Sequence, residues 1–460
     1  MQCRYFGKCG GCVYIDRPYA EQLRIKQDKV SGCLKKAAAN GTCKGFKIEN
    51  IIGADDPYHY RNKVHSVFSR DRKGNVTRGM YREDSHEVVN VSGCLLEDET
   101  ADAIIEEIKR LVPSFKMKIY DEDRGTGFLR HVLVRVAKRH ESNKIPREDG
   151  LNRNNSQNIS NREKSDKKEY MVILVTGEVQ FNGKNNFIKA LRSKFPQITT
   201  IVQNINNKRT SMILGDRSII LYGSGYVVDD SLGFGFRISP SSFFQINTAQ
   251  TRKLYDLVLE MANPTASDTV LDAYCGTGTI GMFLSSEAGH VTGVELNPDA
   301  VKDARDNAKR NKIDNISFIC ADATKYMQEL ALNLQKPALM NDGAGKSSAD
   351  KIRKSNKEFT ILCMDPPRSG STPEFINAAA ELKIPRIVYV SCNPETLGRD
   401  LELFVAKGYI IKRAVPVDMF PFTGHVESIA LLQRMSNTRE RTITLDVEME
   451  DYHRIKNEGR

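Results

Sequence analysis

The chain has 460 residues, of which 40% are hydrophobic and 27% charged. It is too long for a single hydrophobic core, so it is not a small binding module, and its apolar content excludes a wholly disordered protein. Residues 1–238 hold 41 basic and 29 acidic side chains, a net charge of +12, whereas residues 239–460 hold 27 and 29. This asymmetry suggests that the basic first half binds a polyanion and that the near-neutral second half is catalytic. A basic surface can also serve only to keep a protein soluble.

The N-terminal segment, residues 1–14, is short and rich in Gly and Cys, and it leads into an amphipathic pattern that predicts a helix over 19–39. It has no apolar core of the kind found in export signals, and the chain contains no run of about 18 apolar residues. We therefore expect a cytoplasmic protein without a membrane segment, in which the ten cysteines are reduced thiols.

Four of these cysteines form a pattern typical of a metal site. Three follow the spacing C-x5-C-G-G-C near the N-terminus, and one stands apart in the segment VSGC. The four are Cys3, Cys9, Cys12 and Cys94. Four thiolates suit either tetrahedral zinc or a [4Fe-4S] cluster, and the spacing does not decide between them. Cys33 and Cys43 are spare thiols in this interpretation.

The region after the first helix predicts a β-rich domain. Its expected strands are 64–69, 79–91, 129–137 and 170–177, and its expected helix is 101–112. Between 140 and 168 the chain is rich in Asn, Ser, Lys, Arg and Glu. Such a segment buries too little apolar surface to offset its ordering entropy, so we expect a disordered insertion within a hairpin.

From residue 250 onwards, predicted strands alternate with predicted helices. The expected helices are 251–262, 280–288, 298–311, 373–382 and 395–406, and the expected strands are 269–275, 290–296, 316–322, 359–365 and 386–391. Strands that are apolar throughout and alternate with helices require a mostly parallel sheet covered on both faces, which is an α/β fold. A second polar insertion is expected at 336–357.

A candidate cofactor site follows from residues at the ends of these strands. The segment LDAYCGTGTIG (271–281) joins a strand to a helix, and its glycines allow a tight turn close to a ligand, although an ordinary turn explains this segment if it stands alone. Glu295, Asp322 and the segment DPPR (365–368) end three further strands, and such ends converge on one crevice. Residues 250–432 thereby resemble the class I S-adenosylmethionine-dependent methyltransferase fold.

The next strand ends at a candidate nucleophile, Cys392, in the segment SCNP. A thiolate suits addition to C6 of a pyrimidine, which makes C5 nucleophilic enough to accept a methyl group. The C5 proton must then leave, and a carboxylate is the natural base. Glu427 in GHVESIALL is the candidate, because it follows a loop rich in Pro, Gly and aromatic residues and opens an apolar strand.

Five segments in this order and spacing resemble the RNA 5-methyluridine methyltransferases, over about residues 1–433. They are PSSFFQIN (240–247), LDAYCGTGTIG (271–281), DPPR (365–368), SCNP (391–394) and HVES (425–428). The resemblance implies that Cys392 is the nucleophile, that Glu427 is the base, and that Phe243 stacks on a flipped-out uracil. It implies S-adenosylmethionine contacts at Gln245, Tyr274, Thr279, Glu295, Asp322 and Asp365. Many relatives carry Asn at the position of Thr279.

The same resemblance favours a [4Fe-4S] cluster over zinc at the four cysteines, because members of the family with an iron-sulfur cluster share the cysteine pattern. It implies an RNA partner, with 23S ribosomal RNA preferred and transfer RNA as the alternative, and a monomer. The expected division of the chain is a cysteine loop (1–14), a helical segment packed on the catalytic domain (15–46), a central RNA-binding domain (47–238), a methyltransferase domain (239–433) and a charged tail (434–460).

Two more distant alternatives remain. An RNA cytosine-C5 methyltransferase uses similar addition chemistry, but it usually has a second cysteine after the proline where this chain reads Pro366-Pro367-Arg368. A non-catalytic iron-sulfur RNA-binding protein would keep the fold without the reaction.

Overall fold

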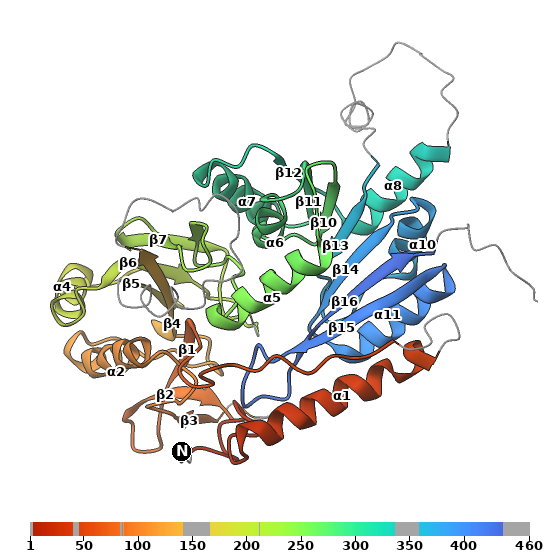
Figure 1. The fold of residues 1–460 in the computed structure, drawn as a ribbon. Helices are drawn as coiled ribbons and strands as arrows, with labels where there is room; N and C mark the ends of the chain where they lie inside the picture. Colours follow the sequence, from red (N-terminus) through yellow and green to blue (C-terminus); the bar gives the residue numbers. More distant parts are fainter. Residues whose placement is uncertain are drawn as a thin grey trace, which may run out of the picture.

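The computed structural model describes residues 3–39, 46–82, 85, 87–140, 166–210, 212–335 and 358–435. Two seven-stranded sheets dominate it, one in each half of the chain (Figure 1). Most of the two predicted insertions and of the predicted charged tail lies outside the described residues. None of the described helices is long and apolar enough to cross a membrane.

The first sheet has the strand order β3-β2-β1-β4-β5-β6-β7. In chain order its strands are β1 Lys63–Arg70, β2 Val76–Tyr81, β3 Val88–Asn90, β4 Leu129–His140, β5 Asp166–Thr176, β6 Ile198–Ile205 and β7 Arg217–Tyr222. The predicted strand at 79–91 is two strands, because the chain turns back between Tyr81 and Val88 and β2 pairs antiparallel with β3. Strands β4 and β5 form a hairpin whose register reaches His140 opposite Asp166.

Two helices, α2 (Glu99–Ser114) and α4 (Lys184–Lys194), cover one face of this sheet. Helix α2 begins where the Asp98 side chain accepts a hydrogen bond from the Ala101 amide, and its apolar residues recur on one face. Ile104, Ile108 and Phe187 pack against alternate residues of β1, β4 and β5 in one core. The two-stranded unit of β8 (Val227–Asp229) and β9 (Phe236–Ile238) then leads toward the second sheet.

The second sheet has the order β12-β11-β10-β13-β14-β16-β15. Its strands are β10 Thr269–Ala273, β11 His290–Glu295, β12 Ile316–Cys320, β13 Ile361–Met364, β14 Arg386–Ser391, β15 Tyr409–Val417 and β16 Glu427–Arg434. Strands β10 to β14 pair parallel, and β16 pairs antiparallel with both β14 and β15. The predicted mostly parallel α/β sheet is therefore confirmed.

Helices cover both faces of the second sheet. They are α5 Thr248–Ala262, α6 Thr279–Leu284, α7 Pro298–Arg310, α8 Ala323–Gln335, α10 Pro373–Glu381 and α11 Pro394–Ala406. Helices α5 and α6 share one core with alternate strand residues, and α8, α10 and α11 share the opposite core. The central strands β13 and β14 are apolar on both sides because both of their faces are buried.

The N-terminal helix α1 (Tyr19–Ala39) belongs spatially to the second sheet, although the next strand along the chain, β1, belongs to the first sheet. Figure 1 shows it in red beside the blue α11 and β15. Val30, Leu34 and Ala37 are fully buried in the core that α11 also lines. The two helices approach so closely that a Cβ atom on Gly398 would lie 2.4 Å from the carbonyl oxygen of Cys33.

The segment that follows α1 runs along the last strand of this sheet. Ile48 and Ile52 form parallel bridges with Ala414 and Val417 of β15. The amides of Glu49 and Ile52 donate hydrogen bonds to main-chain carbonyls of β15, each at 2.9 Å.

Candidate active site

The predicted site residues of the second sheet meet at one edge, where its parallel strands have their carboxyl ends. The strands β10 to β14 are followed or ended in turn by Tyr274, Glu295, Asp322, Asp365 and Cys392. Because β16 runs antiparallel to β14, its first residue, Glu427, lies at the same edge. Ligands bind at this edge in open α/β sheets.

The turn after β10 has a backbone shaped for close approach by a ligand. Gly276 and Gly278 have φ angles of 55° and 79°, which lie in the left-handed region that favours glycine. Tyr274 adopts φ 63° without being a glycine, and such strained residues concentrate at binding sites. The turn is joined to the next strand because the Gly276 amide donates a hydrogen bond to Oε2 of Glu295 at 3.1 Å.

The Glu295 carboxylate is held on both oxygens, since its Oε1 accepts a hydrogen bond from the Asn297 amide at 2.8 Å. Each carboxylate oxygen retains a lone pair, so the group can still accept hydrogen bonds from a ligand hydroxyl. The side chain is half-buried beside the turn. It can therefore orient a ribose that lies across the end of β11.

Three other predicted cofactor residues, Thr279, Asp322 and Gln245, make polar contacts in their own elements. The Thr279 hydroxyl lies 3.0 Å from the Tyr255 hydroxyl of α5. Asp322 accepts a hydrogen bond from the Lys325 amide at 2.9 Å where α8 begins. The main-chain carbonyl of Gln245 accepts a hydrogen bond from the Asn62 side chain at 2.9 Å, which ties the loop before α5 to the segment before β1.

Cys392, Glu427 and Asp365 form one electrostatic group. Burial raises the pKa of Asp365 to about 7. Burial, and then the neighbouring Asp365, raises the pKa of Glu427 to about 8, while Arg368 acts in the opposite direction. Burial also raises the pKa of the Cys392 thiol, Glu427 and Asp365 raise it further, and Arg368 lowers it. The structure thus brings the three residues together and adds a nearby guanidinium.

Sequence reasoning did not single out Arg368, although it lies in the DPPR segment. Its carbonyl oxygen accepts a hydrogen bond from the Asn393 side chain at 3.2 Å, so the residue after Cys392 is fastened to it. Asn393 also caps α11 by accepting from the Glu395 amide at 3.1 Å. A basic residue directly after Asp-Pro-Pro is the signal that could have indicated this role.

Asp400 of α11 was also missed, and it fixes the loop that carries Arg368. It is fully buried, and its Oδ2 accepts hydrogen bonds from the Tyr389 hydroxyl at 2.6 Å and the Ser371 amide at 2.7 Å. The three residues are distant in the sequence, so no local pattern signals their contact. The loop after β13 is thereby fastened to the helix that follows Cys392.

Asp272 of β10 is a third residue that sequence reasoning missed. Its side chain is 1% exposed, and the Gly281 amide at the start of α6 faces it and acts to lower its pKa. Burial, followed by the charge of Asp365, raises its pKa to about 8, so the group is mostly protonated at neutral pH. An acidic residue inside an apolar strand before a glycine turn is its sequence signal.

Phe243 projects from a loop that is itself fixed. Its side chain is 69% exposed, whereas the neighbouring Phe244 is buried. The buried Arg135 of β4 donates hydrogen bonds to the carbonyls of Pro240 and Ser242. An exposed aromatic ring on a fixed loop can stack on a planar ligand without the entropy cost of ordering the loop.

The cysteines of the predicted metal site lie near the loop that precedes Glu427, beside Phe422. Cys3, Cys12 and Cys94 pack around one small hydrophobic cluster whose buried members include Leu96 and Phe422. Burial raises the pKa of Cys12 to about 12, Arg61 opposes this rise, and Cys94, Cys9 and Cys3 add to it. Among the residues described here, no group of three or more His, Cys, Asp or Glu side chains is arranged to hold a metal ion.

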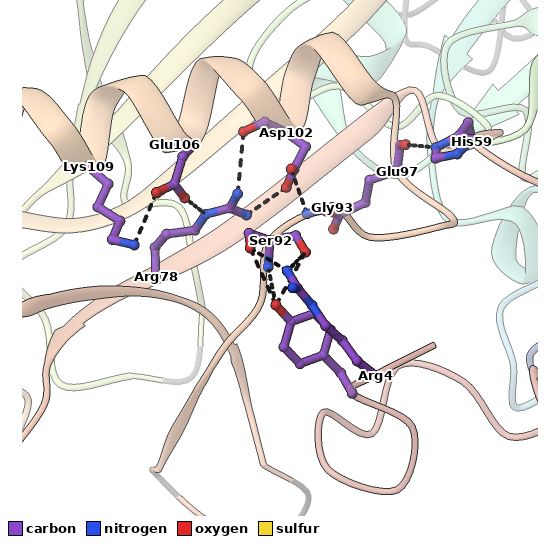
Figure 2. A network of polar contacts seen from close by, with 10 residues as sticks. Arg4, His59, Arg78, Ser92, Gly93, Glu97, Asp102, Glu106 and Lys109 are labelled. Atoms are coloured by element: carbon purple, nitrogen blue, oxygen red, sulfur yellow. Dashed lines mark hydrogen bonds and ion pairs between the residues drawn. The ribbon is translucent and has the colours of Figure 1, made fainter. Parts of the chain in front are cut away.

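A polar network holds the segment before Cys94 (Figure 2). Arg78 of β2, whose side chain is 1% exposed, donates to Asp102 at 2.7 Å and to Glu106 at 3.0 Å. The other oxygen of Asp102 accepts a hydrogen bond from the Gly93 amide at 2.9 Å. The Arg4 guanidinium donates to the carbonyl and hydroxyl oxygens of Ser92. This network therefore fixes Cys94 relative to both α2 and the N-terminal cysteine loop.

Comparisons with known proteins show which family this chain resembles. The model of the family described as tRNA (uracil-5-)-methyltransferase matches residues 226–435. An uncharacterized RNA methyltransferase of Clostridium acetobutylicum is 38% identical over 433 residues, with 94% of this chain and 83% of the relative covered. Another, of Halalkalibacterium halodurans, is 36% identical over 431 residues, with 94% of this chain and 82% of the relative covered.

One solved structure shares the fold over most of the chain. It is the Pyrococcus abyssi tRNA (uracil-54, C5)-methyltransferase in complex with S-adenosyl-L-homocysteine. The TM-score is 0.66 at 24% sequence identity, and the match covers 92% of this chain and 86% of that one.

Proposed function

The chain belongs to the RNA uracil-5-methyltransferase family, and from this premise we propose that it methylates uridine at C5 in RNA with S-adenosylmethionine as methyl donor. One observation carries the proposal: Cys392, Glu427 and Asp365 form one electrostatic group at the edge of the sheet that also holds the glycine turn. A nucleophile, a base and a cofactor turn at one edge are what C5 methylation requires.

The proposed reaction begins with the Cys392 thiolate. Its sulfur adds to C6 of the uracil, and the electrons of the C5–C6 double bond move toward C5 and the C4 oxygen. Bound S-adenosylmethionine supplies a methyl group on a sulfonium, which C5 accepts. The Glu427 carboxylate then removes the C5 proton, the double bond re-forms, and the C6–S bond breaks to release the thiolate. Burial, Glu427 and Asp365 raise the pKa of the Cys392 thiol and so oppose the thiolate, whereas Arg368 acts in its favour.

A pKa of about 8 suits Glu427 for its part in this cycle. The carboxylate form accepts the proton, and the group can lose it again near neutral pH. Since its side chain is 4% exposed, water cannot readily compete for the same proton.

The residues proposed to hold S-adenosylmethionine are those around the glycine turn. Glu295 is oriented for the ribose hydroxyls, and Tyr274 and Asp322 flank the turn. The remaining contacts are proposed for Gln245, Thr279 and Asp365. We assign Phe243 to stacking on the flipped-out uracil, because its exposed ring stands on a fixed loop at the start of this region.

The distribution of charge along the chain indicates which part binds RNA and which part carries out the methylation. We propose that residues 47–238 bind the RNA, since the first half of the chain carries a net charge of +12. Residues 239–433 carry out the methylation, with residues 15–46 packed on them. The packing of α1 against α11 supports that placement.

The four cysteines are proposed to hold a [4Fe-4S] cluster. Their mutual influence on the pKa of Cys12 supports a shared site. Four thiolates suit either zinc or a [4Fe-4S] cluster, and the preference for the cluster rests on the resemblance of the cysteine pattern to that of the iron-sulfur members of the family. C5 methylation needs no electron transfer, so a bound cluster would supply structural support.

We propose large-subunit 23S ribosomal RNA as the substrate, on the strength of the cysteine pattern. Transfer RNA is the second candidate, because the matching family model and the Pyrococcus abyssi enzyme are both described by their action on tRNA. Mapping 5-methyluridine in ribosomal and transfer RNA from a strain that lacks the gene distinguishes the two. Loss of the modification from tRNA alone would overturn the ribosomal assignment.

The mechanism is tested with RNA that contains 5-fluorouridine. Fluorine at C5 cannot be removed by a base, so the enzyme should remain covalently attached to the RNA after methyl transfer. We expect wild type to form an adduct that survives denaturation, Cys392→Ala to form none, and the matched control Cys33→Ala to behave as wild type. If wild type methylates ordinary RNA but traps none of the fluorinated RNA, the thiol mechanism is wrong.

A further inference from the structure

The loop that leads into Glu427, residues 418–425, receives hydrogen bonds from the N-terminal segment of the chain. The amides of Val13 and Tyr14 donate to the carbonyl oxygen of Phe422 at 2.9 and 3.1 Å. The Phe422 amide donates to Oε1 of Gln22 in α1 at 3.0 Å. Both polar main-chain atoms of Phe422 are therefore paired with residues about 400 positions earlier in the sequence.

Phe422 needs this support because its backbone is strained. Its φ angle is 67°, in the left-handed region that a bulky residue rarely adopts, and its side chain is 2% exposed. Such a conformation persists only when the surrounding structure imposes it. The rings of Tyr58 and Tyr19 contact the Phe422 ring with centroids 5.0 and 6.1 Å away, so the strained residue is held on its side chain as well as its main chain.

Helix α1 is anchored to the same loop by a buried ion pair. Nζ of Lys26 lies 2.6 Å from Oδ1 of Asp418, and both side chains are at most 1% exposed. Lys26 also donates to the carbonyl of Phe420 at 3.0 Å, and the Tyr19 hydroxyl donates to Asp418 at 2.8 Å. Three polar side chains of α1, those of Tyr19, Gln22 and Lys26, thus bind the start and the middle of the loop.

The other end of α1 contacts the element that follows the nucleophile. Helix α11 begins directly after Cys392 and Asn393, and Gly398 of α11 lies against the main chain of Cys33. A single helix therefore touches both the helix after Cys392 and the loop before Glu427. Because a packed helix is rigid, it can set the distance between these two elements.

We propose that α1 clamps the two halves of the catalytic group, and that Gln22 is a positioning residue for proton removal by Glu427. Gln22 is fully buried and touches no reacting atom, so its effect would pass through the Phe422 turn. The inference rests on the proposed function, because it assigns the step that Gln22 affects. Addition and methyl transfer depend on Cys392 and the cofactor turn, whereas the final proton removal depends on the loop that Gln22 holds.

The test compares Gln22→Leu with a matched control on the exposed side of the same helix, Asp28→Ala. Leu has a similar volume to Gln but no acceptor for the Phe422 amide. We expect kcat on uridine RNA to fall about tenfold while KM for RNA and the rate of trapping by 5-fluorouridine RNA change by no more than about twofold. We also expect methylated RNA to accumulate as a covalent adduct with Gln22→Leu on denaturing gels. Asp28→Ala should match wild type in all four measurements.

Two results would overturn the proposal. One is an unchanged kcat in folded Gln22→Leu; the other is a parallel loss of trapping and turnover, which a merely structural role would produce. Should Gln22→Leu fail to fold by circular dichroism, Tyr19→Phe of the same helix takes its place. That variant removes the hydroxyl that donates to Asp418 at 2.8 Å and accepts from the Ala54 amide at 2.7 Å, and it should give a smaller accumulation of the same adduct; none would overturn the proposal. Failure of wild type to trap fluorinated RNA would instead contradict the thiol mechanism, so the two failures are distinguishable.

Discussion

Cys392 and Glu427 lie one residue beyond the paired residues Ser391 and Ser428, at the same end of the hydrogen-bonded strands β14 and β16. The antiparallel pairing brings the end of one strand beside the start of the other. The proposed nucleophile and the proposed base are therefore held in register by the main chain of the sheet. Their relative position depends on the loop before Glu427 and on the turn after Ser391.

Replacing Glu427 with Gln should block release of the product rather than its formation. Gln has the shape of Glu but cannot accept the C5 proton, so turnover should fall by a factor of about 10² to 10⁴ while methylated RNA stays attached to Cys392. Radiolabelled RNA that migrates with the protein on a denaturing gel measures this. The exposed Glu402→Gln on α11 is the control. Free methylated product at the wild-type rate would show that another group removes the proton.

Turnover should rise with pH through about 8, the pKa to which burial and Asp365 raise Glu427. Below that pH the carboxyl group is protonated and cannot act as a base. Arg368 opposes the rise of this pKa, so Arg368→Gln should move the midpoint of the profile to higher pH. The measurement is kcat from pH 6 to pH 9 at saturating RNA. A midpoint that moves to lower pH in the variant would contradict the assignment.

The same raised pKa predicts how stability varies with pH. Between the ordinary Glu value of 4.5 and about 8, folded Glu427 keeps a proton that the unfolded chain releases, so stability falls as pH rises across this window. Glu427→Gln lacks that titration. Its stability relative to wild type should therefore grow by about 3 kcal/mol between pH 5 and pH 8. Urea unfolding at the two pH values checks the sign, and a difference that shrinks with pH would refute the burial argument.

Breaking the ion pair of Lys26 and Asp418 should destabilise the protein strongly. Both side chains are at most 1% exposed, so Lys26→Met leaves a buried carboxylate without its cation and should cost about 3–5 kcal/mol. The double variant Lys26→Met, Asp418→Asn removes both charges and should recover most of that loss. Thermal or urea unfolding of the two variants supplies the comparison. Equal losses in the single and double variants would mean that the cost comes from packing and not from charge.

Asp102→Ala should weaken the proposed iron-sulfur site without touching a cysteine. The variant removes the acceptor for the Gly93 amide and one partner of Arg78, so Cys94 loses part of its support. After anaerobic reconstitution we expect less iron and sulfide per chain than in wild type. Lys109→Ala, whose side chain contacts only the outer Glu106 of this network, is the control. Iron content equal to that of wild type would show that this polar network does not support the proposed metal site.

The second sheet was largely predictable because its signals are local. Each parallel strand is an apolar run, and polar residues that follow such runs must meet where carboxyl ends converge, which is why Glu295, Asp365 and Cys392 were found at one edge. Strands β6, β7 and β15 and helix α4 were missed. Strand β7 is largely exposed, and α4 buries only Phe187 and Leu191, which leaves little periodicity. The buried strands β6 and β15 are interrupted by polar residues such as Gln203 and Lys412.

The support of the candidate site was not predictable, because it depends on contacts between distant residues. Lys26 and Asp418 are 392 positions apart, and neither lies in a recognisable motif. The left-handed backbone of Phe422 has no sequence signal, since aromatic residues rarely adopt it. Arg368 lies in the recognised DPPR segment. Its influence on the pKa values of Cys392 and Glu427 could not be predicted, however, because it depends on how three separate strand ends meet.

The segment that bridges Ile48 and Ile52 to β15 also protects the molecule from self-association. β15 is the last strand of its sheet, and an uncovered last strand offers a row of free amides and carbonyls to any other extended chain. The bridging segment occupies part of that row and so leaves less of it for strand addition by a second molecule. Replacing Glu49 and Ile52 with proline would remove the two amides that bond to β15 while leaving α1 in the core, and such a variant should aggregate through its β-sheet.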